Sequence, residues 1–420
     1  MLRRIIAFAV PVALCHVFAV GQNSAYKAVY YVDGNIEKEQ YRSHVTLESL
    51  EVGKSVVYAT GGVKLNLTSM RLNKTSGGMN DRTHRQTGEN SVVLVDDGSK
   101  VVMDVCSLNT HTNLTDGVTA KGDSTTVTIN EGYFSATRAG SALFNALDGG
   151  NISIGHAKIN TYARQSPSFY TGPGGMIDVT RCDCKCTGQA SAMIHSCGDV
   201  TVYKGRLEVS KWALADVDGG SVRLTECDLT SGDISGFLIY GAEEKSEGGQ
   251  LTLIKNDMTV KEGPVFLVTN TSAEITVYNK NIIKCKSGEL ISVRADDWGI
   301  KGSNGGKAVL NIEKQSLAGY SYVDSISSLS VVLKKSGLLK GQINRTENRE
   351  AEVRVTLEEG GKWKSKGDSY ITSIVFNQPL EKGLKQLKGK HTIYYDASDP
   401  LNAPLEGKVY KTGGGQLRPM

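Results

Sequence analysis

One short phrase of apolar residues recurs along this chain, and its clearest copy lies at residues 213–229. Val222 and Leu224 are two positions apart, a spacing that places both side chains on one face of a β-strand. Leu229 then begins the next inward-facing segment after a bend. A unit of this size cannot bury its own apolar face, so it needs copies of itself above and below.

These copies can be counted by searching for apolar residues at positions p, p+2 and p+7. The pattern occurs with p at Leu65, Val101, Val127, Ile152, Ile177, Val200, Val222, Leu251, Ile275, Leu310 and Val331. Most steps between successive copies are 21 to 29 residues, and two longer steps of 36 and 35 residues indicate inserted loops. A period in the low twenties, with β-branched residues and Gly-rich turns, is typical of a β-solenoid.

We therefore predict an all-β fold, a single right-handed parallel β-helix of about eleven or twelve coils with a cap at each end. Each coil would add about 4.8 Å along the axis, which is the spacing between paired strands. The 47 glycines suit many tight turns. A β-propeller is the alternative, but propeller blades repeat at about 40–45 residues, roughly twice the period seen here.

The ends of the chain differ from the repeat. Residues 1–21 have a basic start, an apolar stretch and small residues near a cleavage site, which predicts a signal peptide. We expect an N-terminal cap at 22–60, the β-helix at 61–377 and a C-terminal cap at 378–420. No other stretch is long and apolar enough for a membrane span after signal cleavage, so we expect a secreted or cell-surface protein.

Charge and motifs exclude several function classes. A net charge of +4 arises from 48 basic and 44 acidic residues, without a basic block interleaved with aromatic residues, so nucleic acid is not an expected partner. The sequence lacks a P-loop and an EF-hand calcium loop, and no cofactor is predicted. The oligomeric state stays open.

Seven cysteines remain beyond the predicted signal peptide. Cys106, Cys182 and Cys227 fall at p+5, an inward position, where Cys acts as a small apolar residue. The cluster at residues 182–186 together with Cys197 could bind zinc, but it lacks the usual C-x2-C spacing, so no metal site is predicted. A disulfide between neighbouring coils, such as Cys186 to Cys197, is the favoured interpretation.

The last third of the chain carries a resemblance. The segments are Gly-Pro-Val-Phe-Leu-Val-Thr-Asn-Thr-Ser at 263–272, the Trp-Gly loop with Gly-Ser-Asn-Gly-Gly at 298–306, Ser-Tyr-Val-Asp-Ser-Ile-Ser-Ser-Leu at 321–329, and Tyr-Tyr-Asp with Gly-Gly-Gly-Gln-Leu-Arg-Pro at 394–419. Over residues 262–420 the chain resembles a family of secreted bacterial β-helix proteins described as adhesin-like. The family has no established chemistry, so the resemblance implies the fold and transfers no catalytic residue.

Two rows of outward side chains are candidate sites. In the p+1 row, Asp178 and Arg223 lie two coils apart, with Asp199 and Tyr203 nearby. Asp178, Asp199 and Arg223 are candidate catalytic residues, because hydrolysis needs paired carboxyl groups about 5–10 Å apart and elimination needs a base with a cation. Tyr203 is a candidate ligand-binding residue. Ordinary surface charge is the alternative interpretation.

The second row precedes each Gly-rich turn and also contains Asp218, Asn270 and Arg294. There His195 and Asp216 occupy adjacent coils and are further catalytic candidates. Tyr240 is a candidate for ligand binding, as is the loop in which Asp296 and Asp297 precede Trp298, which resembles a sugar-stacking platform with carboxylates. Trp298 could equally pin its loop to the wall.

These observations favour an adhesin-like protein that binds a polysaccharide or a surface glycan along one flank. The alternative is a polysaccharide lyase or glycoside hydrolase acting on a carbohydrate polymer, and the sequence leaves open whether the protein is an enzyme. An enzyme would gather aromatic and charged side chains into one groove, whereas an attachment protein or scaffold would scatter them.

Overall fold

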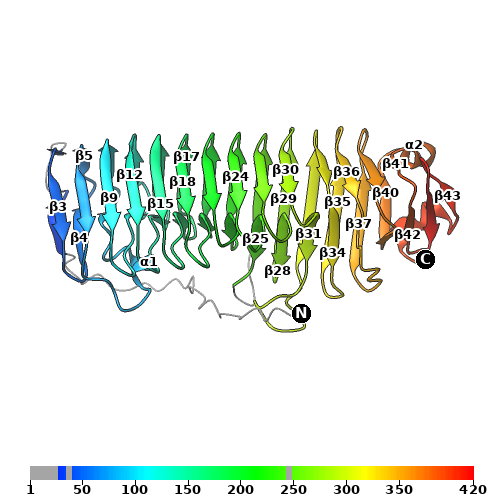
Figure 1. The fold of residues 1–420 in the computed structure, drawn as a ribbon, viewed down its shortest axis with the longest axis horizontal. Helices are drawn as coiled ribbons and strands as arrows, with labels where there is room; N and C mark the ends of the chain where they lie inside the picture. Colours follow the sequence, from blue (N-terminus) through cyan, green and yellow to red (C-terminus); the bar gives the residue numbers. More distant parts are fainter. Residues whose placement is uncertain (1–26, 35–39, 243–247) are drawn as a thin grey trace.

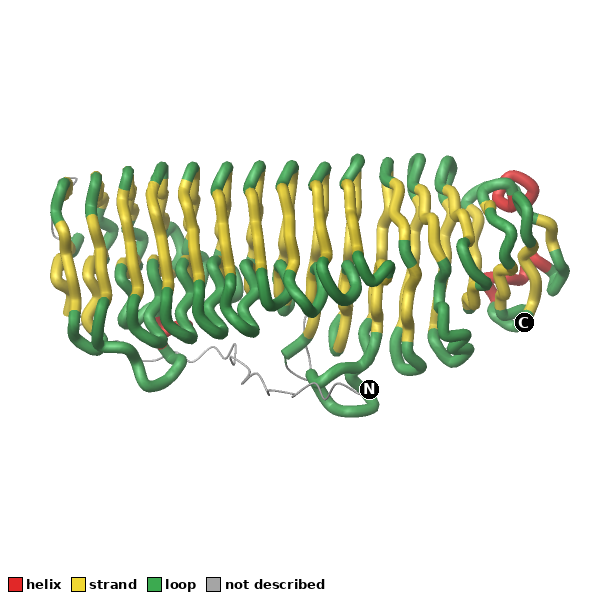
Figure 2. The backbone as a smooth tube through the Cα atoms, in the orientation of Figure 1, coloured by secondary structure: helices red, strands yellow, loops and turns green. Residues whose placement is uncertain are grey.

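The computed structural model describes residues 27–34, 40–242 and 248–420, and these form a parallel β-helix of about fifteen turns (Figure 1). Three long sheets run along the rod, and each coil contributes a short strand to each of them in turn (Figure 2). The predicted fold class is confirmed. The predicted signal peptide, residues 1–21, lies outside the described residues.

Sheet A has twelve strands: β1 (Lys27–Val32), β4 (Lys54–Ala59), β7 (Val93–Val95), β10 (Val118–Lys121), β13 (Phe144–Leu147), β16 (Phe169–Thr171), β19 (Ile194–Ser196), β22 (Ala215–Val217), β25 (Phe237–Tyr240), β28 (Phe266–Thr269), β31 (Glu289–Val293) and β34 (Tyr320–Val323). Sheet B has fourteen: β2 (Gln40–Ser43), β5 (Lys64–Thr68), β8 (Lys100–Asp104), β11 (Thr126–Ile129), β14 (Asn151–Gly155), β17 (Met176–Thr180), β20 (Asp199–Tyr203), β23 (Ser221–Thr225), β26 (Gly249–Ile254), β29 (Ser272–Tyr278), β32 (Lys307–Glu313), β35 (Ser328–Leu333), β37 (Glu352–Leu357) and β40 (Ser373–Phe376).

Sheet C has ten strands: β3 (Thr46–Ser49), β6 (Arg71–Lys74), β9 (Cys106–Thr110), β12 (Gly132–Ala136), β15 (Ala157–Thr161), β18 (Asp183–Cys186), β21 (Arg206–Val209), β24 (Asp228–Ser231), β27 (Asp257–Val260) and β30 (Ile282–Cys285). Two four-stranded sheets follow in the last coils. Sheet D contains β33 (Ser316–Ala318), β36 (Leu338–Gly341), β38 (Lys362–Ser365) and β41 (Leu387–Lys388), and sheet E contains β39 (Ser369–Ile371), β42 (Thr392–Tyr395), β44 (Gln416–Pro419) and β43 (Tyr410–Lys411).

Helices are few and short. They are α1 (His84–Thr87), α2 (Leu380–Leu384) and the 3₁₀ helix η1 (Pro400–Leu405). None of the helices in the described residues is long or apolar enough to cross a bilayer.

The predicted interior column at position p is confirmed. Each p residue on sheet B pairs with the p residue of the next coil, from Leu65 through Val101 to Val331, and each is at most 2% exposed. Aromatic residues fill much of the space under sheet A, where Phe144 stacks on Phe169 at 5.8 Å and Phe237 on Phe266 at 5.9 Å between ring centroids. The repeat therefore buries one continuous apolar core.

Two predicted p+7 positions are wrong by one residue. Met258 pairs with Ile283 rather than Ile282, which is 56% exposed, and Leu317 pairs with Leu339 rather than with Leu338. The corner that follows the sheet B strand contains one more residue in these coils, and it leads into sheet C before Ile282 and into sheet D before Leu338. Since side chains alternate along a strand, one extra residue moves the neighbouring side chain to the interior.

A column of polar side chains follows one interior corner. Cys106, Cys182 and Cys227 are buried there, as predicted. Further along, the Asn281 backbone N–H donates to Gln315 Oε1, and the Asn256 side chain donates to Asn281 Oδ1 at 3.0 Å. These amides satisfy one another within the core.

The predicted disulfide is wrong. None of the seven cysteines in the described part of the chain is joined to another in a disulfide. Cys186 is buried beneath sheet C, whereas Cys197 follows strand β19 of sheet A and is partly exposed.

The number of coils is higher than the predicted eleven or twelve, because paired strands extend beyond the recognised repeat at both ends. Strands β1 to β4 already pair with the coils that follow them, and β37 to β42 continue the stack at the other end. The last sheet ends with an antiparallel pair, β43 with β44.

Two insertions leave the coils on the same side of the rod, below sheet A in the view of Figure 1. The first, residues 75–91, contains α1 and is anchored where buried His84 lies 3.6 Å from buried Asp116. Burial raises the pKa of Asp116, but the neighbouring His84 and Arg85 lower it by a larger amount. The pKa of Asp116 therefore lies below its usual value. The second insertion is the loop 294–306, held by Asn304, whose side chain donates to the carbonyl oxygens of Asp296 and Trp298.

Candidate functional site

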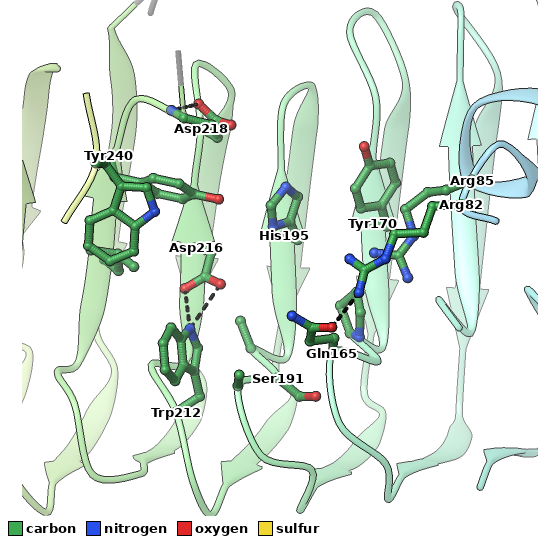
Figure 3. A pocket seen from close by; sticks show the side chains of 16 residues that line it. Arg82, Arg85, Gln165, Tyr170, Ser191, His195, Trp212, Asp216, Asp218 and Tyr240 are labelled. Atoms are coloured by element: carbon green, nitrogen blue, oxygen red, sulfur yellow. Dashed lines mark hydrogen bonds between the residues drawn. The ribbon is translucent and has the colours of Figure 1, made fainter. Parts of the chain in front are cut away.

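A groove lies on the outer face of sheet A between the two insertions (Figure 3). Its volume is about 80 Å³, and its floor crosses strands β16, β19, β22 and β25. The turns that lead from sheet C into sheet A form one wall through Gln165, Ser191 and Trp212. The groove therefore runs across coils, along the axis of the rod.

Strand alternation builds the floor. Phe169, Ile194, Ala215 and Phe237 point into the core and are fully buried. Their neighbours Tyr170, His195, Asp216 and Leu238 face outward and are aligned in register on adjacent coils. The repeat thus sets four different side chains in one row at the spacing of paired strands, about 4.8 Å.

His195 is held between two aromatic rings. Tyr170 stacks on its imidazole with centroids 5.1 Å apart and an interplanar angle of 10°, and Tyr240 meets it edge-on at 6.5 Å. Burial, together with the positive charge of Arg85, lowers the pKa of His195 to about 3. The imidazole is therefore neutral at pH 7 and can donate from one nitrogen and accept at the other.

Asp216 faces the wall that contains Trp212. Both of its carboxyl oxygens accept from the Trp212 indole N–H, at 2.9 and 3.0 Å. Burial raises the pKa of Asp216 to about 8; the indole hydrogen bond lowers it, and the charge of Asp218 raises it. The groove thus contains a carboxyl group that is largely protonated near neutral pH.

The two ends of the groove differ in chemistry. Arg82 and Arg85 reach one end from the segment of α1, where Arg85 lies 5.0 Å above the Tyr170 ring and Arg82 donates to Gln165 Oε1. At the other end Trp298 lies 5.0 Å from Tyr240, at an interplanar angle of 51°. One end therefore offers guanidinium groups and the other an aromatic surface.

Three side chains at the groove could hold a metal ion. One donor atom from each of His195, Cys197 and Asp218 can be chosen so that all lie within 4.8 Å of one another. Cys197 Sγ is 3.8 Å from His195 Nε2. Asp218 Oδ1 accepts from the Ala242 backbone N–H at 3.2 Å.

The predicted site residues fall into two groups, one at the groove on sheet A and one on the outer face of sheet B. His195, Asp216, Tyr240 and Trp298 line the groove, and the register places His195 directly beside Asp216. Asp296 flanks it and pairs with Arg294 at 3.2 Å, while Asp297 is exposed.

Asp178, Asp199 and Arg223 lie elsewhere, on the outer face of sheet B. Thr201 lies between Asp178 and Arg223 in the register. Tyr203 is exposed at the end of strand β20 in the same sheet, with Lys204 above its ring. Burial raises the pKa of Asp178, with a smaller contribution from the charge of Asp199.

Sequence reasoning missed several groove residues. Tyr170 occupies the position of His195 one coil earlier, so extending the row backwards would have found it. Trp212 donates to Asp216 but lies in the turn before β22, outside both rows of candidate side chains. Arg82 and Arg85 come from an insertion, and no periodicity in the sequence connects them to sheet A.

Comparisons with known proteins identify no relative. No family model matches the chain, and searches of curated proteins and of solved structures give no significant match. The resemblance to secreted bacterial proteins is therefore supported by the structure only for its fold, a parallel β-helix.

Proposed function

We propose that this protein is exported and binds a carbohydrate polymer in the groove on sheet A. The observation that supports the proposal is the gathering of Arg82 and Arg85, the outward row of sheet A, and the Tyr240–Trp298 pair into one groove. Sugar recognition commonly combines flat aromatic surfaces with hydrogen-bonding groups that fix orientation. Export is inferred from residues 1–21 and cell-surface display from the resemblance.

The shape of the groove favours a polymer. Its floor crosses four coils, which corresponds to three strand spacings, roughly 15 Å. An enclosed site for a small molecule typically has about 300–1,000 Å³. At about 80 Å³ the groove is too small to enclose such a ligand, so the ligand proposed is an extended chain of which only a part lies in the groove.

The charges favour an acidic sugar. Guanidinium groups bind carboxylates through paired, charge-assisted hydrogen bonds. Arg82 and Arg85 offer such groups at one end, and His195 and Asp216 in their favoured protonation states add no charge to the floor at pH 7. A uronic acid polymer is therefore the expected ligand class.

The first test compares Trp298, which is partly buried at the groove, with Tyr203, which is exposed on sheet B. Trp298→Ala should weaken binding of a uronic acid polymer at least tenfold, because it removes the aromatic end of the groove. Tyr203→Ala is the matched control on sheet B and should leave affinity unchanged. Binding of the mature protein to acidic and neutral polysaccharides is measured by calorimetry or on a glycan array. Equal affinity of wild type and Trp298→Ala for every polysaccharide bound would refute the proposal.

Hydrolysis of the bound polymer is the second candidate function. It is supported because the charged and aromatic side chains lie together in one groove, as expected for an enzyme, and are not scattered over the surface. Asp216 lies in β22 and Asp218 directly follows this strand, two residues along, so their backbone positions are about 7 Å apart. Paired carboxyl groups of glycoside hydrolases are separated by about 5–10 Å. One of the pair would donate a proton to the leaving oxygen and the other would act on water or on the sugar.

If the protein is a hydrolase, a substitution at Asp216 should abolish turnover and preserve binding of the polymer. Asp216→Asn should abolish the release of new reducing ends while retaining most of the affinity, because the amide keeps the shape of the side chain but cannot donate the proton. Asp178→Asn, on sheet B, is the control and should retain full activity. If no acidic or neutral polysaccharide yields reducing ends with wild type, binding without hydrolysis is the function.

A further inference from the structure

We infer that His195, Cys197 and Asp218 form a binding site for a divalent transition-metal ion of the zinc class at the edge of the groove. A single donor atom from each residue lies within 4.8 Å of the other two. This spacing fits three ligands that share one ion rather than three separate surface groups.

The nitrogen–sulfur distance agrees with tetrahedral coordination. Zinc binds imidazole nitrogen at about 2.0–2.1 Å and thiolate sulfur at about 2.3 Å, which places the two donors about 3.5 Å apart in a tetrahedron. His195 Nε2 and Cys197 Sγ are 3.8 Å apart, so a movement of a few tenths of an ångström brings this pair to the tetrahedral spacing.

The backbone of the β-helix brings the ligands together. His195 lies in β19 and Cys197 directly after it, two residues along, so both side chains leave the same face. Asp218 follows β22 on the next coil, and its backbone N–H donates to Ser196 O at 2.8 Å. The parallel ladder thus fixes Asp218 beside Cys197 independently of any ion.

Neighbouring groups restrain two of the ligands. The rings of Tyr170 and Tyr240 fix the imidazole of His195, and the Ala242 N–H holds one oxygen of Asp218. Such surrounding contacts orient metal ligands and increase metal affinity by reducing the freedom lost on binding.

The donor set selects the ion. One nitrogen, one sulfur and one oxygen donor suit Zn²⁺, whereas Mg²⁺ and Ca²⁺ prefer oxygen ligands alone. A thiolate and a carboxylate together carry two negative charges, which balance the charge of the ion. Three protein ligands leave a fourth tetrahedral position, and since His195 and Asp218 line the groove, a water or a substrate oxygen can occupy it.

The cysteine-rich segment considered from sequence is not this site. Cys182, Cys184 and Cys186 are buried in the core. Of the four cysteines once grouped together, only Cys197 faces the groove region, and its partners come from sheet A rather than from a cysteine motif.

Metal titration of the mature protein tests the inference without any carbohydrate. Metal-stripped wild type should bind one equivalent of Zn²⁺ by calorimetry, and Co²⁺ should give the absorption of a thiolate-ligated tetrahedral ion. Cys197→Ser and Asp218→Asn should each weaken Zn²⁺ binding at least tenfold. Cys285→Ser, at another partly exposed cysteine, should not. Circular dichroism confirms that each variant is folded.

Absence of Zn²⁺ binding at micromolar concentrations, or affinity that is unchanged in both Cys197→Ser and Asp218→Asn, would overturn the inference. The inference goes beyond the proposed function and fails separately from it, since the titration contains no polysaccharide. It also gives Asp218 a different role from that in hydrolysis, because a metal-bound Asp218 would be a ligand and not the second carboxyl group.

Discussion

Val105 occupies a corner at which the backbone turns from sheet B to sheet C. The corner after a sheet B strand has φ between 51° and 56° at Ser69, Val105, His156, Arg181, Lys204, Glu226 and Lys255, and at Lys314, where the chain enters sheet D. This left-handed conformation costs an L-residue about 1–2 kcal/mol, and a β-branched side chain fits it worst. Val105 is also 52% exposed, so it gains little from burial.

We expect Val105→Asn to raise the free energy of unfolding by about 1 kcal/mol, because Asn tolerates positive φ better than Val. Val309→Asn is the matched control, since Val309 is similarly exposed but lies within strand β32. That change should be neutral or slightly destabilising. Chemical denaturation of both variants measures the difference, and a loss of stability in Val105→Asn would contradict the assignment of strain to this corner.

At the residue scale, sequence predicted those site residues whose position the register determines. His195 and Asp216 were found because the repeat gives each a known place in its coil. Arg82 and Arg85 were not, because the path of an inserted loop depends on contacts, such as that of Arg85 with the Gly140 carbonyl, which no local pattern encodes. Cys197 was predicted to form a disulfide with Cys186, but Cys186 is buried beneath sheet C and Cys197 follows a strand of sheet A.

At the element scale, sheet D contains an exposed column of like charges. Lys340 pairs with Lys364, and Lys364 with Lys388, on three adjacent strands. Neighbouring strands lie about 4.8 Å apart, and like charges placed directly opposite each other destabilise a sheet by roughly 0.2–1 kcal/mol. The column thus imposes a cost on the last coils.

Replacing the middle lysine tests this cost. Lys364→Gln should stabilise the protein by about 0.5 kcal/mol at low salt, and the gain should shrink in 1 M NaCl, where the screening length is about 3 Å. Lys185→Gln is the control, because Lys185 faces Glu208 at 3.5 Å and its removal should not stabilise. A gain in Lys364→Gln that is independent of salt would point to a cause other than charge repulsion.

The sequence predicted the strand positions correctly where the corner between two strands has the same number of residues from coil to coil. Sheet B was predicted in register throughout, whereas the errors at Ile282 and Leu338 both follow a corner with one extra residue. A fixed spacing cannot detect such an insertion, because apolar residues stand at both alternative positions.

At the scale of the whole molecule, the rod was predictable because each coil packs only on its neighbours, so one repeat specifies the entire architecture. The coil count was too low because terminal coils must present a polar end to solvent, and their sequences depart from the interior pattern. The groove could not be predicted as a unit, since it needs two insertions that are distant in sequence to reach the same side.

The number of coils between those insertions has a further consequence. Arg85 and Trp298 belong to separate loops, each attached to its own coil, so the span between the two loops is set by how many coils are stacked between them. Duplicating or deleting one coil would change that span by about 4.8 Å without altering either loop. The number of stacked coils therefore determines how long a ligand chain must be to contact both loops at once.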